Sequence, residues 1–357
     1  MEDKVTVKAD FLSTTHGKQT CVSCHGGVES ATEKDASHKG MMKDPSLKAD
    51  KACSSCHSTI VSTAAQSLHT TIGGFESTLA TRGGTMGSGH LQEGFDNHCA
   101  KCHASCGQCH VSRPTSVGGG LLSGHDFVKT PPMKETCTSC HVTRVGQEFL
   151  GENEGFDGDV HWTKAAMLCN KCHGNELHAA TKEGEDRYTK SGARECLDCH
   201  EKVTPGKSGI QQHDIHGDKM SCQVCHSVTY KNCYGCHVGK DDKDVKYFKT
   251  EATEMDFKIG LNPLQSAERP YKYVTLRHAP ASASGFDFYA KDLLPGFNAV
   301  PTWKYATPHN IQKKTPQNSS CNTCHGNAKL FLTASDIRPA EVEANRKVVV
   351  PEVPKPR

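Results

Sequence analysis

All 20 cysteines of this 357-residue chain lie in ten copies of one pattern, Cys-x-x-Cys-His. On a helical turn, residues three and four apart are neighbours, so each copy presents two thiols and an imidazole on one face. The thiols can form thioether bonds to the two vinyl groups on one edge of a porphyrin, and the imidazole can then reach the iron. Each copy is therefore an attachment signature for haem c, and the sequence predicts ten covalently bound haems.

The ten copies are numbered as motifs 1 to 10 in chain order. The cysteines predicted to carry the thioether bonds are Cys21 and Cys24, Cys53 and Cys56, Cys99 and Cys102, Cys106 and Cys109, Cys137 and Cys140, Cys169 and Cys172, Cys196 and Cys199, Cys222 and Cys225, Cys233 and Cys236, and Cys321 and Cys324. The histidines predicted to bind iron on the proximal side are His25, His57, His103, His110, His141, His173, His200, His226, His237 and His325. Because the motifs use every cysteine, none is left for a disulfide or a catalytic thiol, and we expect no catalytic residue.

Three other uses of paired cysteines compete with this interpretation. Cysteine-rich secreted chains form disulfides, paired CxxC units bind zinc, and single CxxC units serve in thioredoxin-like redox sites. None of these explains a histidine directly after every second cysteine. With 22 histidines in 357 residues, ten chance occurrences would have a probability on the order of one in a trillion.

Twelve histidines lie outside the motifs, close to the ten that a second axial ligand on every iron requires. We predict imidazole on both faces of each iron, which gives low-spin haems of low reduction potential suited to electron transfer. The predicted distal ligands are His16, His69, His90, His98, His125, His161, His178, His216, His278 and His309. The weakest candidates are His38, in a lysine-rich loop, and His213, which competes with His216 three residues on. The sequence does not pair any distal histidine with a particular motif.

The composition argues against a conventional core. Only 35% of the residues are hydrophobic and the mean hydropathy is −0.59, whereas ordinary globular chains contain about 45–50% apolar residues. Nine motifs fall between Cys21 and His237, which leaves little chain for layered secondary structure. We predict a mostly irregular fold with short α-helices at the CxxCH motifs, little β-structure and a core of stacked haems.

Three regions are expected along the chain. Residues 1–240 form a dense nine-haem region. Residues 241–333 form an aromatic-rich lobe that carries motif 10, with a strand expected over Tyr271–His278. This lobe is either a packed cover for haems or a partner-binding surface, and the distant haem of motif 10 is a candidate terminal exit or junction with another molecule. Residues 334–357 form an extended tail, either disordered or able to add a strand to a neighbouring molecule.

The charge and the hydropathy of the chain restrict its possible partners and its cellular location. The formal charge of +2 omits the cofactors; ten ferric haems would bring it to roughly −8, and reduction would then draw in protons. No basic block supports nucleic-acid binding, and no apolar run reaches the roughly 18 residues of a membrane span. The start MEDKVTVKAD has no apolar leader, yet haem c is attached outside the cytoplasm. We therefore expect a mature, extracytoplasmic form, in the periplasm, at the cell surface or in the extracellular space.

The ten motifs and the loose histidines between Cys21 and His325 resemble the multihaem c-type cytochromes of metal-respiring and other anaerobic bacteria and archaea. The resemblance implies electron transfer to other redox proteins or extracellular acceptors, without enzymatic activity. Some members are discrete carriers and others polymerise into filaments, and both forms stay open for this chain. The alternative is a multihaem reductase of a small nitrogen or sulfur compound, which would need one open axial position; a haem store is a third interpretation.

Overall fold

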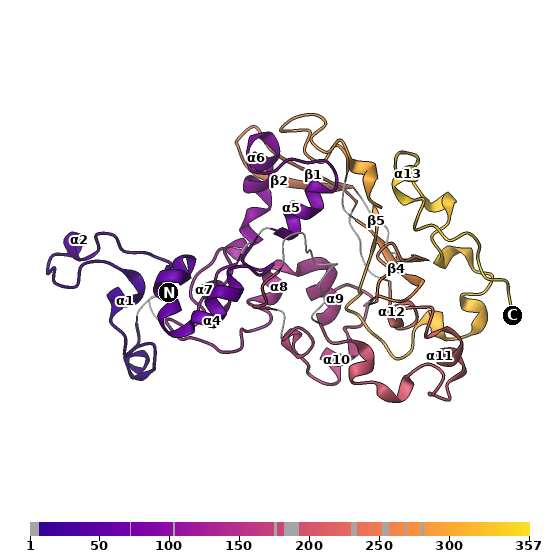
Figure 1. The fold of residues 1–357 in the computed structure, drawn as a ribbon, viewed down its shortest axis with the longest axis horizontal. Coiled ribbons are helices and arrows are strands. Elements are labelled where there is room, and N and C mark those ends of the chain that lie inside the picture. The colour runs from indigo at the N-terminus through magenta and orange to yellow at the C-terminus, as the bar shows by residue number, and fades with distance from the viewer. Residues whose placement is uncertain are drawn as a thin grey trace. The chain divides into compact units, whose positions relative to one another are not determined.

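The computed structural model describes residues 7–71, 73–102, 104–174, 177–181, 193–229, 234–251, 257–267, 269–279 and 282–357. The chain divides into two units, each assembled from several segments (Figure 1). Unit 1 comprises Met1–Gly74, Ala100–Cys140 and His173–Lys190, and unit 2 comprises Phe75–Cys99, His141–Cys172 and Ser191–Arg357. Both units therefore combine stretches of chain that are distant in sequence.

Unit 1 is built from short helices joined by irregular segments. Its α-helices are α1 (Cys21–His25), α2 (Lys34–Ser37), α3 (Ala49–Ala52), α4 (Ser54–Ala64), α7 (Cys106–His110) and α8 (Cys137–Cys140). Its 3-10 turns are Ala9–Ser13, Pro45–Lys48, Ala100–Cys102 and Thr115–Val117. Even the 11-residue α4 is interrupted at His57, whose backbone leaves the helical region. Helices this short depend on tertiary or cofactor contacts, because isolated helices under about 12–15 residues are marginal in water.

Unit 2 combines short helices with strands. Its α-helices are α6 (Gly89–His98), α9 (Gln147–Leu150), α10 (Val160–Thr163), α11 (Gln211–His216), α12 (Cys222–His226), α13 (Val342–Asn345) and most of α5 (Gly73–Ala80). A π-helical turn covers Val142–Gly146, and 3-10 turns cover Cys169–Lys171, Cys196–Asp198, Glu201–Val203, Phe297–Ala299, Pro316–Asn318, Cys321–Thr323, Ala328–Leu330, Ala334–Asp336 and Pro339–Glu341. In the described part of the chain, every helix is too short or too polar to cross a membrane.

Motif 9 differs from the other motifs in local structure. Its described residues Cys236 and His237 lie in strand β1 (Tyr234–Lys240), whereas the nine other motifs all place residues in helical turns. β1 pairs antiparallel with β2 (Lys246–Glu251). The prediction of a short α-helix at every motif is therefore wrong for motif 9, where the strand pairs with β2, and motifs 3, 6, 7 and 10 form 3-10 turns instead of α-helices.

A second sheet contains three antiparallel strands in the order β3 (Lys258–Leu261), β4 (Tyr273–His278) and β5 (Trp303–Tyr305). The strand predicted over residues 271–278 is β4, and all its residues after Tyr273 are buried. Gly260 of β3 lies opposite Val274 of β4. Apart from these two small sheets the described chain is helix and coil, so the predicted mostly irregular fold with little β-structure is confirmed.

The apolar core lies almost wholly in unit 2. One buried cluster consists of Val274, Leu276, Trp303, Leu332 and Val348, and another of Val224, Ile259, Phe331 and Val350. Among the residues described in unit 1, the buried hydrophobic side chains are Ala64 and Met133 alone. Burial of apolar surface is the main stabilising term in folding. The described residues of unit 1 therefore bury almost no apolar side chains.

The C-terminal tail folds back on its own chain. Val348 and Val350 are buried, and the Val350 N–H donates to the Leu332 carbonyl at 2.9 Å. Further along, the Gly326 N–H donates to the Pro354 carbonyl at 2.6 Å. The tail is therefore ordered by contacts within unit 2. The extended tail and its possible addition as a strand to a neighbouring molecule stay predictions.

Candidate haem-binding sites

Six motif histidines face a histidine from outside the motifs. The pairs and the distances between their ring centres are His25–His125 (6.1 Å), His57–His16 (6.1 Å), His110–His178 (6.0 Å), His200–His161 (6.0 Å), His226–His213 (6.1 Å) and His325–His216 (6.3 Å). The first three pairs lie in unit 1 and the last three in unit 2. These pairs are the candidate iron sites of motifs 1, 2, 4, 7, 8 and 10.

The spacing of the rings fits one metal atom between two imidazoles. A metal at about 2 Å from each ligating nitrogen, with each ring centre about 1 Å behind its nitrogen, sets the ring centres about 6 Å apart. Aromatic rings in ordinary contact also lie about 4.5–7 Å apart, so the distance alone does not decide. The kind of residue in each pair favours a metal site over an ordinary ring contact, because each of the six pairs joins one motif histidine to one loose histidine. Haem c attached through the motif cysteines fits between rings so arranged.

Four of these motif histidines are oriented by a hydrogen bond to a backbone carbonyl. Nδ1–H donates from His25 to Met42 (2.8 Å), from His110 to Val128 (2.7 Å), from His226 to Gln312 (3.1 Å) and from His325 to Lys355 (2.9 Å). A proton on Nδ1 leaves the lone pair on Nε2, which is the nitrogen that a metal requires. The carbonyl also raises the basicity of the ring. The chain therefore holds these rings in the tautomer that can bind iron.

The loose histidines differ in what their Nδ1 atoms contact. His216 donates to the Gln212 carbonyl, 3.1 Å away and one turn earlier on the same helix. The Nδ1 atoms of His125 and His213 are buried, and no described side chain or carbonyl accepts a hydrogen bond from them. A hydrogen bond at Nδ1 from the described chain therefore does not fix the tautomer of these two rings.

The distal histidine of motif 7 has a carboxylate partner. Nδ1 of His161 lies 2.8 Å from Oδ1 of Asp159, whose side chain is almost completely buried. This hydrogen bond raises the pKa of His161, against the lowering effect of burial. Asp159 also precedes helix α10, and the same oxygen accepts the His161 backbone N–H at 2.8 Å.

A short segment of unit 1 contacts the histidines of three motifs. His125 faces the proximal histidine of motif 1. Phe127 stacks on His16, the partner of motif 2, with ring centres 4.0 Å apart, and the Val128 carbonyl accepts from His110 of motif 4. Residues 125–128 therefore contact the histidines of motifs 1, 2 and 4, although motif 3 lies between motifs 2 and 4 in sequence.

Two predicted distal ligands use Nε2 elsewhere. His278 is 2% exposed, and its Nε2 lies 2.7 Å from Oε2 of Glu341. Nε2 of His98 lies 2.7 Å from the Tyr289 hydroxyl. A nitrogen engaged in such a contact binds iron only if the contact breaks. In this geometry both Nε2 atoms are engaged by protein groups, and ligation of iron by His98 and His278 stays a prediction.

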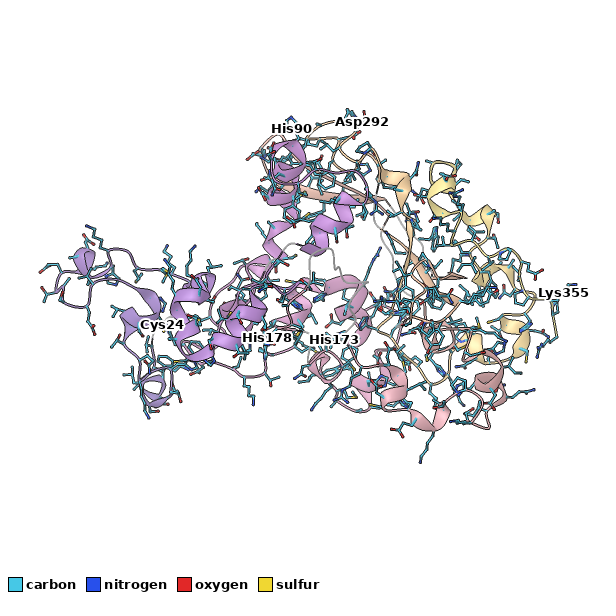
Figure 2. The ribbon with its side chains drawn as sticks, viewed as in Figure 1. Cys24, His90, His173, His178, Asp292 and Lys355 are labelled. Carbon is cyan, nitrogen blue, oxygen red and sulfur yellow. The ribbon has the colours of Figure 1, made fainter. Side chains whose placement is uncertain are left out.

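The remaining predicted ligands have other surroundings. His90 projects from α6 with 64% of its side chain exposed (Figure 2). The backbone carbonyl of His69 accepts from the Ala104 N–H at 3.0 Å, and the backbone N–H of His309 donates to Oε2 of Glu148 at 2.9 Å. His103 of motif 3 and Cys233 of motif 9 lie outside the described residues.

The sequence marks His213 as one of the weakest ligand candidates, whereas the structure places it opposite His226. The spacing of the two neighbouring histidines does indicate a ligand role for His213. His213 and His216 are three residues apart, so on a helix they share one face and can serve two neighbouring sites. Ligation by the motif histidines stays a prediction, and those of motifs 3, 5, 6 and 9, which are His103, His141, His173 and His237, are in none of the six pairs.

Sulfur atoms from different motifs also meet. Cys196 of motif 7 is hydrogen bonded to Cys222 of motif 8, and Cys102 of motif 3 to Cys140 of motif 5. Across the described parts of the chain, no cluster of three or more His, Cys, Asp or Glu side chains is arranged to hold a metal ion. The zinc-ribbon alternative, which needs four ligands, therefore gains no support.

Paired cysteines on helical turns, together with motif histidines that face loose histidines, are the arrangement expected of haem c attachment sites. No protein-family model matches the chain, and no solved structure matches it significantly. Among curated proteins, the chain is similar to the multiheme cytochrome MtrA of Shewanella baltica (strain OS185), with 26% identity over 219 residues.

The matched region covers 55% of this chain and 60% of the Shewanella protein, so the chain spans less than two thirds of that relative. The similarity supports a multihaem c-type cytochrome family for this chain, with haem c as its cofactor. It also agrees with an electron carrier better than with an enzyme.

Proposed function

We propose that this chain is a decahaem c-type cytochrome that conducts electrons through closely spaced bis-histidine haems. The observation that carries the proposal is the set of six ring pairs at 6.0–6.3 Å. Haem c supplies the one-electron Fe(III)/Fe(II) couple, so transfer between two sites oxidises one iron and reduces the other with no bond made or broken. Because imidazole closes both axial positions, these sites leave no coordination position for a substrate.

The ring pairs give six axial assignments. We infer that His125, His16, His178, His161, His213 and His216 are the distal ligands of motifs 1, 2, 4, 7, 8 and 10, in that order. The proposed set of distal ligands therefore includes His213 in place of His278, which the sequence predicted. For motifs 3, 5, 6 and 9, bis-histidine ligation rests on the number of loose histidines.

Electron conduction requires iron sites that lie close together, and contacts within the chain join several of the proposed sites. In unit 2, motif 7 meets motif 8 through Cys196 and Cys222, and helix α11 supplies the distal ligands of motifs 8 and 10. In unit 1, residues 125–128 join motifs 1, 2 and 4. The spatial order of haems therefore departs from the sequence order. Motif 10, which the sequence sets apart, becomes a neighbour of motif 8.

We propose that the protein works outside the cytoplasm, in the periplasm, at the cell surface or in the extracellular space. It exchanges electrons with other redox proteins or extracellular acceptors. The need to attach haem c outside the cytoplasm supports this location. A filament of identical subunits is the alternative to a discrete carrier, and imaging of the native purified protein decides between them. Only single particles at every concentration would end the filament version.

Two measurements on the purified holoprotein test the function. Intact mass should equal that of the chain plus ten haems. Electron paramagnetic resonance (EPR) of the oxidised protein should show low-spin haems only, unchanged by cyanide. A high-spin haem that binds cyanide would favour a reductase of small nitrogen or sulfur compounds. Haems that fail to exchange electrons in a redox titration would favour storage.

A further inference from the structure

Asp159 is a buried carboxylate fixed against the distal histidine of motif 7. Its side chain is 4% exposed. Oδ1 lies 2.8 Å from Nδ1 of His161 and 2.8 Å from the backbone nitrogen of the same residue. Oδ2 accepts the Ile311 N–H at 2.9 Å. Both oxygens are therefore held by the chain, and the imidazole is aligned against one of them.

This partner differs in charge from those of the other paired histidines. Where the structure gives the Nδ1 atom of another paired histidine an acceptor, that acceptor is a neutral backbone carbonyl, as for His25, His110, His216, His226 and His325. Hydrogen bonds to ionised groups are roughly twice as strong as those between neutral groups. The carboxylate therefore gives the His161 ring more imidazolate character than the other five receive.

Helix capping does not account for this arrangement. Asp159 is the N-cap of α10, and a cap needs only the bond to a backbone N–H. α10 has four residues, and a buried carboxylate is costly unless it is paired and hydrogen bonded. The contact with the imidazole ring adds a partner that capping does not require. The ring contact therefore calls for a separate explanation.

We propose that Asp159 is a positioning residue that lowers the reduction potential of the seventh haem below that of haems whose histidines donate to carbonyls. The inference rests on the axial pair His161 and His200 proposed above. A more basic imidazole stabilises Fe(III) more than Fe(II), and a buried negative charge acts in the same direction. The seventh site is then the hardest to reduce in the run formed by motifs 7, 8 and 10.

The substitution Asp159→Asn tests the proposal in the holoprotein. The amide oxygen can still accept from both nitrogens of His161, but the charge is gone. In a redox titration, one of the ten components should move to higher potential, and the low-spin EPR signal of one haem should change. Asp44→Asn is the matched control, because Asp44 caps a helical turn through the Ser46 N–H at 3.0 Å and lies near Cys53 and Cys106. A response of Asp159→Asn that equals the control overturns the proposal.

If the Asp159→Asn variant does not bind all ten haems, two ligand variants test the proposal instead. Methionine ligation raises the potential of a haem, so His161→Met marks the wild-type component that belongs to motif 7, and His216→Met marks that of motif 10. The component lost in His161→Met should have the lower potential, and the reverse order overturns the proposal. If His161→Met leaves the spectra unchanged, the axial assignment itself fails. A spectral change with the reverse order refutes the role of Asp159 alone.

Discussion

His213 and His216 lie three residues apart on helix α11, and each faces the proximal histidine of a different motif. Their partners, His226 and His325, are far apart in sequence. One turn of helix therefore fixes the distal sides of two iron sites relative to each other. This relationship makes motif 10 part of a continuous run of sites in unit 2.

The ligand role of His213 can be tested by substitution. In His213→Met, the haem of motif 8 should change from bis-histidine to histidine–methionine ligation, which raises its potential. One of ten components in a redox titration should move, and a new methionine–iron absorption band should appear. His38→Met is the matched control, because the sequence marks His38 as an equally weak candidate and none of the six ring pairs includes it. Equal responses of the two variants would show that His213 binds no iron.

Contact between the tail and motif 10 can be broken at Gly326. Its φ is +79°, and a Cβ there would lie 2.7 Å from Pro356, so Gly326→Ala should displace the tail. His325 then loses the Lys355 carbonyl that accepts from its Nδ1, and the potential of one haem should rise. Gly118→Ala is the control, since Gly118 has a φ of +88° and open space around a Cβ. Redox titration of both variants measures the difference; a shift in both, or in neither, contradicts the role of the tail.

Unit 2 contains a buried ion pair whose loss should destabilise it. Glu148 and Arg277 lie 2.8 Å apart with side chains 0% and 5% exposed. Burial raises the pKa of Glu148 despite Arg277, and lowers the pKa of Arg277 to about 10. Glu148→Gln leaves a buried charge without its partner, which should cost about 3–5 kcal/mol in guanidinium denaturation.

The control for this variant is an exposed ion pair. Lys291 is 76% exposed, and its bond to Asp287 should contribute little. Asp287→Asn should change the free energy of unfolding by less than about 1 kcal/mol. A cost for Glu148→Gln as small as that of the control would show that the buried pair is not needed for stability.

Haem removal should affect the two units differently. Protein produced without haem attachment keeps the apolar cluster around Val274, Leu276 and Leu332 in unit 2, whereas the buried hydrophobic residues described in unit 1 are Ala64 and Met133. Hydrogen exchange should therefore show full loss of protection in unit 1 and residual protection in β3 to β5. Protection retained in unit 1 would mean that haem does not supply its core.

The features that the sequence predicted are local ones. Attachment through CxxCH depends on five adjacent residues, and the alternation of residues 271–278 indicates β4 without knowledge of its partners. A helical turn at each motif follows from the same local spacing. It is wrong at motif 9, where residues 246–251 pair with the motif as β2.

Features set by distant contacts were not predictable from the sequence. The contact between His278 and Glu341 joins residues 63 positions apart, and the sequence around His278 does not indicate it. His213 looks redundant until His226 is placed opposite it. Likewise, the composition of the tail does not indicate its backbone contacts with residues 326 and 332. The division into three sequence regions stays a prediction.

Bis-histidine ligation at the six ring pairs can be tested by a structure of the haem-loaded protein at side-chain resolution. We expect an iron between the two rings of each pair, with His213 and His216 on the irons of motifs 8 and 10. An iron at one of these motifs with an open axial position, or with a ligand other than the paired histidine, would contradict this expectation.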